Sequence, residues 1–562
     1  MLLPANKKIK CVLILYTCIQ AACLNAQPKS NRADITVKQL GTVGISSVRI
    51  RRDPASGNLY MVQNDGNIKR VDFGAGGAVS FTTVYQKSDH GLNAPLGIAF
   101  GQGGTMYLVG NDSTSQFGTA TIVKGVPDTP GSENRTWSVL ATTVAYPYGN
   151  VYNHRMSGIV VDPTGDYIYV NSGAATDHGE LRAGYREVGL TSIILKLPTS
   201  GQNIILQDDR EWLRSNGYLL AEGIRNSFDF AYSGNGDLFD VQNSGDRDDP
   251  EEMNWIREGH HYGFPWRIGG NNTPQRFTPY NPRTDPLLSP NAWGGGNLYA
   301  TFSNDPSYPP PPAGVTFTDP ISSSGPDADK FRDTLTGAVR NASQLGLTIP
   351  TFTPHRSPNG IVFDKDSVLA SDLKGGALVI CLANSGLLTA LGDTSQDLLH
   401  IDLTKSADSY TAHVTRLVSG FNSPLGIELV GNKLYVVETG LWAGNNSPKL
   451  WEITLPAAIS SVTRTEGLPG VFELRQNYPN PFNPSTTISF SVPHAENIKL
   501  VIDDMLGRQI RTLLSENVTS GTNSVEWDGK DANGMSVGSG VYFYQLKAAS
   551  GFIKTRKMVL MK

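Results

Sequence analysis

The sequence has few cysteines, few charges and no long hydrophobic run beyond its first residues. Three of its four cysteines lie within residues 1–26, and only Cys381 lies beyond them. A disulfide within the folded protein is therefore not expected, and no C-x-x-C pair is present for zinc or redox chemistry. Packing, with bound ions as a further source, must supply the stability that disulfides give many exported proteins.

The low content of charged residues and the small net charge limit the kinds of partner that we expect. Charged residues are 17% of the 562 residues, and the formal net charge is −4. A mildly acidic chain of this size gives no reason to expect a nucleic-acid partner. The sequence also lacks an H-E-x-x-H motif, so a zinc peptidase has no support.

The first 26 residues have the pattern of a signal peptide. Three lysines precede the apolar run CVLILYTCIQAACLNA, and Ala26 offers a small-residue cleavage point. Cys23 follows IQAA, a weak match to a lipoprotein site, so lipidation is an alternative. The run is too short for a membrane span, and no later segment is long enough either. We expect export and a mature chain without a transmembrane segment, whose net charge is −7 once the three lysines are removed.

The abundance of glycine, proline and aromatic residues favours an all-β protein of short strands and turns. The chain has 59 Gly, 34 Pro, 21 Tyr and 20 Phe. One pattern, an apolar strand followed after a turn by a second β run, occurs six times. The copies are SVRIRR at Ser47, PLGIAF at Pro95, MSGIVV at Met156, SFDFAY at Ser227, PNGIVF at Pro358 and PLGIEL at Pro424.

Repeats of this length, built of strands, predict the blades of a β-propeller. The intervals are 61, 71, 131 and 66 positions, measured between the aligned residues Gly97, Gly158, Asp229, Gly360 and Gly426. We therefore predict a six-bladed β-propeller over residues 35–457. The longest interval holds an insertion of about residues 263–350, rich in Pro, Gly and Asn, which we expect to form long loops over one face. It contains no copy of the motif, and a seventh blade inside it is the alternative.

Polar residues precede the innermost strand of each predicted blade. Innermost strands line the central channel of a propeller, so these residues should lie at one rim of its mouth. The residues four positions before the aligned ones are Asn93, His154, Arg225, Arg356 and Asn422, with Asn226 and His355 beside two of them. The set predicts a ligand site at the channel mouth. The alternative is a polar rim that holds water.

Five carboxylates crowd a glycine-containing loop in the fourth unit. They are Asp246, Asp248, Asp249, Glu251 and Glu252. Carboxylates this close repel one another unless a cation or an arginine relieves them, and hard oxygen ligands suit Ca²⁺. The spacing is not that of an EF-hand loop. The run indicates either a calcium site or a solvated acidic loop.

Several motifs together resemble the soluble glucose/sorbosone dehydrogenase family. They are RNSFDFAYSGNGDLFDVQN, DRDDPEEMNWI and GHHYGFPW in the fourth unit, with NHRMSGIVVDPTGDYIYVNSG, PHRSPNGIVF and SDLKGG elsewhere, in the family's order. Members are six-bladed propellers that use pyrroloquinoline quinone (PQQ) and calcium. The resemblance covers most of residues 40–457. It implies a dehydrogenase that oxidises a sugar or a sugar-derived aldehyde or alcohol and passes electrons to an external acceptor.

The resemblance assigns roles to individual residues. His154 matches the general base that takes a proton from the sugar hydroxyl as hydride passes to the quinone. Arg225 and Asn226 match residues that contact the cofactor, and Lys374 matches a lysine that pairs with it. With His355 beside the rim, these residues form the expected cofactor-binding set.

The resemblance also implies two calcium sites. Ser244 and Gly245 match backbone carbonyls that hold the cofactor's Ca²⁺, which acts as a Lewis acid. Glu252 and Tyr262 match ligands of a second, structural Ca²⁺.

The chain departs from the family pattern at three places. The loop SGFNSPLG before the last blade has no arginine where some members carry a pair. The aspartate that accompanies the base in some members would fall near Gly173 or Ala174, although Asp177 and His178 are close. A glutamine of the second blade is also absent. A non-catalytic propeller that binds carbohydrate or a surface partner is therefore an alternative. A metal-dependent lactonase ranks third, because it needs a carboxylate deep in the channel and the rim supplies none.

Residues 472–562 begin a new pattern after a Ser-, Thr- and Gly-containing linker at 458–471. Alternating strands and turns over about ninety residues suit a small Ig-like β-sandwich. QNYPNPFNP, LGR, WDG, SGVYFY and the terminal KMVLMK resemble the type A sorting domain of the type IX secretion system. The resemblance implies a secreted or surface-attached protein with the secretion machinery as a partner. The alternative is an ordinary Ig-like binding module.

Overall fold

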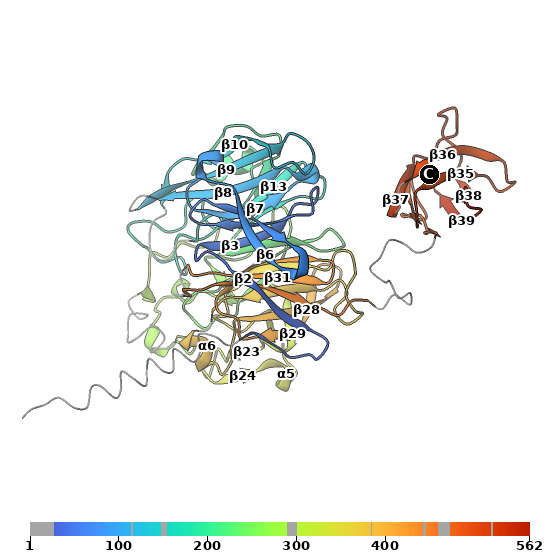
Figure 1. Ribbon diagram of the computed structural model, residues 1–562. Coiled ribbons are helices and arrows are strands. Elements are labelled where there is room, and N and C mark those ends of the chain that lie inside the picture. Colours follow the sequence, from blue (N-terminus) through green and yellow to red (C-terminus); the bar gives the residue numbers. More distant parts are fainter. Residues whose placement is uncertain are drawn as a thin grey trace, which may run out of the picture. The chain divides into compact units, whose positions relative to one another are not determined.

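The chain divides into two compact units, Met1–Ala458 and Ile459–Lys562 (Figure 1). The computed structural model describes residues 27–113, 116–147, 154–288, 301–383, 385–441, 445–458, 472–518 and 521–561. The expected signal peptide and all but the first residue of the expected linker lie outside these ranges. Within them, no helix has the length and apolar character needed to cross a membrane.

Six sheets of the first unit are blades, and their innermost strands form a closed ring. These strands are β3 (Ser47–Arg52), β7 (Pro95–Phe100), β12 (Ile159–Val161), β17 (Ser227–Tyr232), β26 (Pro358–Phe363) and β30 (Pro424–Val430). Each packs against the next, and β30 packs against β3. The ring confirms the predicted six-bladed propeller, and each innermost strand lies in one of the six sequence repeats.

The remaining strands complete the blades from the channel outward. The second strands are β4 (Leu59–Gln63), β8 (Met106–Ser113), β13 (Tyr167–Ser172), β18 (Leu238–Gln242), β27 (Ala377–Cys381) and β31 (Lys433–Glu438). The third strands are β5 (Ile68–Phe73), β9 (Phe117–Pro127), β14 (Ile193–Pro198), β19 (Glu252–Ile256), β28 (Asp397–Lys405) and β32 (Lys449–Thr454). The outer strands are β6 (Val79–Tyr85), β10 (Arg135–Thr143), β16 (Leu219–Glu222), β29 (Tyr410–Ser419) and β2 (Thr36–Thr42). Because β2 pairs with β32, the start of the chain closes the last blade.

Glycine recurs in the innermost strands because neighbouring blades approach closely there. A Cβ atom on Gly97 would lie 2.2 Å from the carbonyl oxygen of Ser157 in the next blade. Gly158, Gly360 and Gly426 meet the following blade in the same way. The first and fourth repeats carry Arg49 and Asp229 at the aligned position. These two fully buried side chains form a 2.7 Å ion pair between β3 and β17, which belong to opposite blades of the ring.

The insertion forms no seventh blade within its described part. The hairpins β20 (Arg267–Ile268) with β21 (Asn271–Asn272) and β23 (Lys330–Arg332) with β24 (Val339–Asn341) stand apart from the blades. Strands β22 (Ser322–Pro326) and β25 (Ile349–Pro350) instead extend the fifth sheet beyond β29. The described α-helices of the unit are short: α2 (Lys87–His90), α3 (Arg210–Ser215), α5 (Ala342–Leu345) and α6 (Gly386–Ala390).

Short strands also pair at the edges of blades. They are β1 (Lys29–Ser30) on β29, β11 (Tyr146–Pro147) on β9 and β15 (Ile204–Leu206) on β10. The one cysteine in the described residues, Cys381 on β27, is buried and free, so packing and ion pairs hold this unit together.

The second unit is a small β-sandwich, as predicted. One sheet contains β33 (Glu473–Leu474), β34 (Thr486–Val492) and β37 (Gly521–Trp527). The other contains β36 (Gln509–Val518), β35 (Glu496–Asp503), β38 (Gly540–Ala548) and β39 (Ile553–Leu560). A core that includes Phe490, Trp527 and Tyr544 joins the two sheets.

Candidate functional site

His154 lies at the rim of the channel, five positions before Ile159, where β12 begins. Its backbone N–H donates to the carbonyl of Ala174, and a Cβ atom on Gly173 would lie 2.3 Å from the His154 Cβ, so glycine is required there. The His154 Nδ1 is buried and has no hydrogen-bond partner in the described part of the chain. Burial, together with the positive charge of Arg225, lowers the pKa of His154 to about 3. The imidazole is therefore neutral near pH 7 and can accept a proton.

Arg225 precedes β17, and its guanidinium is held beside His154 by Asp177. The Nη2 atom donates to the Asp177 carboxylate at 2.7 Å, and Nε donates to the Asp177 carbonyl at 2.9 Å. The Nη1 atom donates to the carbonyl of Asn243 at 3.0 Å. Three of the five guanidinium N–H groups are thus used in these bonds, and the other two have no partner among the described residues, which leaves them for a ligand. Asn226, the next residue, donates to the Asn243 side chain at 3.2 Å.

Asp177 and His178 join the site from the loop after β13. Burial alone would raise the pKa of Asp177, but Arg225 and His178 outweigh it and hold that pKa below its ordinary value. The His178 ring lies 2.9 Å from the Asp177 carboxylate and stacks on Phe302 of the insertion at 3.8 Å. The sequence placed both residues near the base but gave no means of assigning them a role. The only signal was an adjacent Asp–His pair just after an inner hairpin.

Ser244 and Gly245 belong to the loop that meets Asp177. A Cβ atom on Gly245 would lie 3.0 Å from an Asp177 carboxylate oxygen, and the Asp246 N–H donates to that carboxylate at 3.2 Å. The Ser244 Oγ is buried without a partner among the described residues. Within those residues, no hydrogen bond ends on the carbonyl oxygen of Ser244 or Gly245. Carbonyls beside a carboxylate are a donor set that Ca²⁺ accepts.

Protein cations relieve much of the acidic run. Asp248 accepts hydrogen bonds from His355 at 2.8 Å and from Arg332 at 2.6 Å, while Arg247 binds Asp249 at 2.7 Å. Although burial acts against it, the bond to Asp248 raises the pKa of His355 above its ordinary value. His355 therefore binds the acidic run. Asp248 and Asp249 need no metal ion to balance their charge.

Glu252 and Tyr262 line one small cavity together with Ser244 and Arg225. Its volume of about 10 Å³ is close to that of one water molecule. Burial raises the pKa of Glu252 to about 7, and its oxygens accept from the Gly269 N–H at 2.6 Å and from a side-chain amide. No group of three or more His, Cys, Asp or Glu side chains among the described residues is arranged to hold a metal ion. The second calcium site stays a prediction.

The structure does not bring Lys374 to the His154 end of the channel. Lys374 is exposed in the loop that joins β26 to β27, and the N–H of Gly375 donates to Asp364 at the far end of β26. Arg356, at a rim position, is fully buried and forms ion pairs with Asp393 and Asp397. Neither cation is available where Arg225 and His154 meet.

Comparisons with known proteins give matches for each unit. Residues 482–551 match a family model described as the FlgD Ig-like domain. No curated relative matches the chain. The PQQ-bound aldose sugar dehydrogenase of Streptomyces coelicolor is similar at 16% identity and a TM-score of 0.41, covering 75% of this chain and 99% of that chain. The PQQ domain of pyranose dehydrogenase from Coprinopsis cinerea is similar at 15% identity and a TM-score of 0.47, covering 76% and 98%. The soluble aldose sugar dehydrogenase of Escherichia coli is similar at 13% identity and a TM-score of 0.44, covering 75% and 99%.

Proposed function

We propose that the protein is a secreted, PQQ- and Ca²⁺-dependent dehydrogenase that oxidises a sugar or a sugar-derived aldehyde or alcohol. The observation that carries the proposal is His154, a neutral imidazole with a buried and unpartnered Nδ1 at the channel mouth. The motifs that resemble the glucose/sorbosone dehydrogenase family supply the identity of the cofactor. An external electron acceptor completes the reaction.

The residues around His154 fit this cofactor. The Ser244 and Gly245 carbonyls, next to Asp177, offer hard oxygens to Ca²⁺. Arg225 has two N–H groups left for a carboxylate of PQQ, and Asn226 adds an amide. Lys374 lies at the end of its blade that is distant from His154. Arg225 is therefore the main cation that binds the cofactor carboxylates.

Residues of the chain accept the hydroxyl proton of the sugar and balance the charges around it. PQQ with its Ca²⁺, when bound, supplies the acceptor for the hydride. His154 accepts the hydroxyl proton of the sugar on a ring nitrogen, and the charge of Arg225 helps to keep that nitrogen unprotonated beforehand. Asp177 orients Arg225 through the bonds at 2.7 and 2.9 Å, and it balances the guanidinium charge.

PQQ titration of the metal-free protein, with and without added Ca²⁺, tests the cofactor. We expect a saturable change in PQQ absorbance that needs Ca²⁺ and is reversed by a chelator, followed by dye reduction when aldoses are added. A variant with Lys374→Ala should bind PQQ like the wild type, because that side chain lies away from the site. Absence of binding at high micromolar PQQ would instead favour a non-catalytic carbohydrate-binding propeller.

We further propose that the β-sandwich at 472–562 directs export through the type IX secretion system. The support is the set of sorting-domain motifs together with the Ig-like match over residues 482–551. In a bacterium that has this system, the full chain should reach the medium or the cell surface. A chain ending before residue 472 should stay behind the outer membrane. Equal export of both chains would overturn the assignment.

A further inference from the structure

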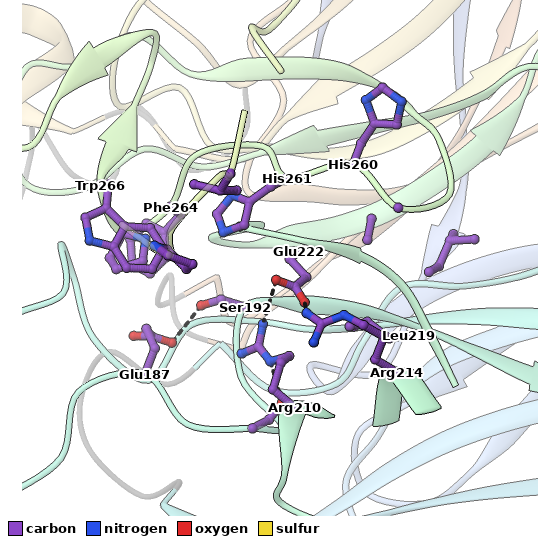
Figure 2. A pocket seen from close by; sticks show the side chains of 18 of the residues that line it. Glu187, Ser192, Arg210, Arg214, Leu219, Glu222, His260, His261, Phe264 and Trp266 are labelled. Atoms are coloured by element: carbon purple, nitrogen blue, oxygen red, sulfur yellow. Dashed lines mark hydrogen bonds and ion pairs between the residues drawn. The ribbon is translucent and has the colours of Figure 1, made fainter. Parts of the chain in front are cut away.

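We propose that a groove beside blade 3 binds a neutral saccharide, at a place separate from the His154 site. The groove has a volume of about 990 Å³. One wall carries Glu222 of β16 with Arg210 and Arg214 of α3, and the other carries His261, Phe264 and Trp266 from the loop after β19 (Figure 2). Concave sites of this size, with aromatic walls and a few polar groups, are typical of small-molecule binding.

The charges in the groove are paired with one another. Arg214 binds the Glu222 carboxylate, and Arg210 lies 3.9 Å from it (Figure 2). Arg210 also donates to backbone carbonyls, among them that of Thr191 at 2.7 Å. Glu187 accepts a hydrogen bond from Ser192 at 2.6 Å and acts electrostatically on Arg210, and Glu258 forms an ion pair with Lys196 at 2.9 Å. With cations and carboxylates matched, the groove is suited to a ligand without net charge.

His261 presents a hydrogen-bond donor to the groove. Its Nδ1 accepts a hydrogen bond from the Gly263 N–H at 3.1 Å. A ring whose Nδ1 is an acceptor carries its proton on Nε2. The residue is only 7% exposed, and no hydrogen bond to Nε2 is formed by the described residues. Figure 2 shows this ring between the aromatic wall and Glu222.

The backbone holds the His261 ring in this place. A Cβ atom on Gly223 would lie 2.4 Å from both Cε1 and Nδ1 of the ring, so the ring rests directly on the glycine. Trp266 beside it is fixed by a 2.8 Å hydrogen bond from its indole to the carbonyl of Pro309. The donor and the aromatic surface are thus set before any ligand arrives, which reduces the entropy cost of binding.

These groups match the chemistry of a sugar ring. Sugar hydroxyls both donate and accept, so they can bond to the Nε2–H of His261 and to the exposed edges of the Arg214–Glu222 pair. The C–H faces of the ring can pack on Trp266, whose ring stacks on Phe317 at 6.1 Å. An anionic ligand would find both arginines of the groove facing Glu222, and a cationic ligand would find Glu222 bound by Arg214 and Glu258 bound by Lys196.

The start of β14 lies between the groove and His154, and the groove shares Gly223 and Phe264 with the small cavity beside Arg225. Ser192 lines the groove, its N–H donates to the carbonyl of Gly173 at 3.2 Å, and Gly173 packs on His154 from the other side. A saccharide held here would therefore be a second bound unit and would not be the reacting one. The inference goes beyond the proposed dehydrogenase function and does not require PQQ.

Binding to the full chain, without PQQ or Ca²⁺, tests the inference. Calorimetry and tryptophan fluorescence would follow additions of glucose, cellotriose, maltotriose and xylotriose, with glucuronate as a charged probe. We expect saturable binding of at least one neutral saccharide and a preference for it over glucuronate. His261→Leu should weaken binding about tenfold, whereas His261→Gln, whose amide nitrogen replaces Nε2–H, should stay within about threefold.

A groove-filling variant secures the interpretation if the His261 variants fold poorly. Ala313 is exposed on the loop that lines the groove, so Ala313→Trp should block binding without disturbing the core. No saturation by any neutral saccharide up to about 100 mM would overturn the proposal. Unchanged affinity in both His261→Leu and Ala313→Trp would overturn it as well. Neither result bears on PQQ binding at His154.

Discussion

At the scale of single residues, burial and one guanidinium set the protonation of His154. An unfolded histidine titrates near 6.5, but folded His154 has its pKa lowered to about 3. Between these values the unfolded chain binds more protons, so the contribution of this group to stability is full above the unfolded pKa and is lost as pH falls. Relative to His154→Gln, the wild type should lose about 2 kcal/mol more unfolding free energy between about pH 7 and about pH 5. Equal losses in chemical denaturation would refute the buried neutral state.

The sequence predicted the site residues whose place depends on the innermost strands. A fixed offset from each repeat put His154 and Arg225 on one rim, and the structure brings them together with Asp177. The sequence could not predict the position of Lys374. This residue lies in the loop after β26, at the end of that strand opposite to the His154 rim. The sequence also could not show that Arg356 is engaged in ion pairs, because its partners Asp393 and Asp397 come from a later part of the chain.

At the scale of elements, the two repeats that lack glycine at the aligned position form an ion pair between opposite blades. Arg49 of β3 is fully buried, and its partners are Asp229 of β17 at 2.7 Å and the carbonyls of Leu96 and Phe228. Removing one member of a buried pair leaves the other charge uncompensated. Asp229→Ala should therefore reduce the unfolding free energy by about 3–5 kcal/mol.

The double variant Arg49→Met with Asp229→Leu is the matched control for this ion pair. It removes the charges of Arg49 and Asp229 and fills the space with apolar atoms, while Arg51, which also binds Asp229 at 2.5 Å, keeps the Glu428 carboxylate at 3.9 Å. The double variant should therefore recover part of the stability lost in Asp229→Ala. Denaturant unfolding of the three proteins measures the effect. A loss below about 1 kcal/mol in Asp229→Ala would show that the pair contributes little.

Local patterns predicted strands well and long-range pairing poorly. The six inner strands were visible because each carries an apolar run and a turn at the same spacing. Strands β22 and β25 were not visible, because they form by pairing at the edge of the fifth sheet and have no pattern of their own. The predicted long loops of the insertion therefore include strands that enlarge a blade.

At the scale of the whole molecule, the propeller brings residues distant in sequence to one rim. The last blade is completed by β2 on β32, with Val37 paired to Ile453, so both ends of the propeller segment belong to one blade. This closure fixes six inner strands whose first residues share one end of the channel. The second unit has a sandwich core of its own.

The most direct measurement is turnover of the PQQ- and Ca²⁺-loaded protein carrying His154→Gln. His413→Gln on the exposed side of β29 is the matched histidine control. Both variants should bind PQQ as the wild type does. His413→Gln should keep full sugar-dependent dye reduction, and His154→Gln should lose about 10²–10⁴-fold in kcat. Near wild-type turnover in cofactor-loaded His154→Gln would contradict the account.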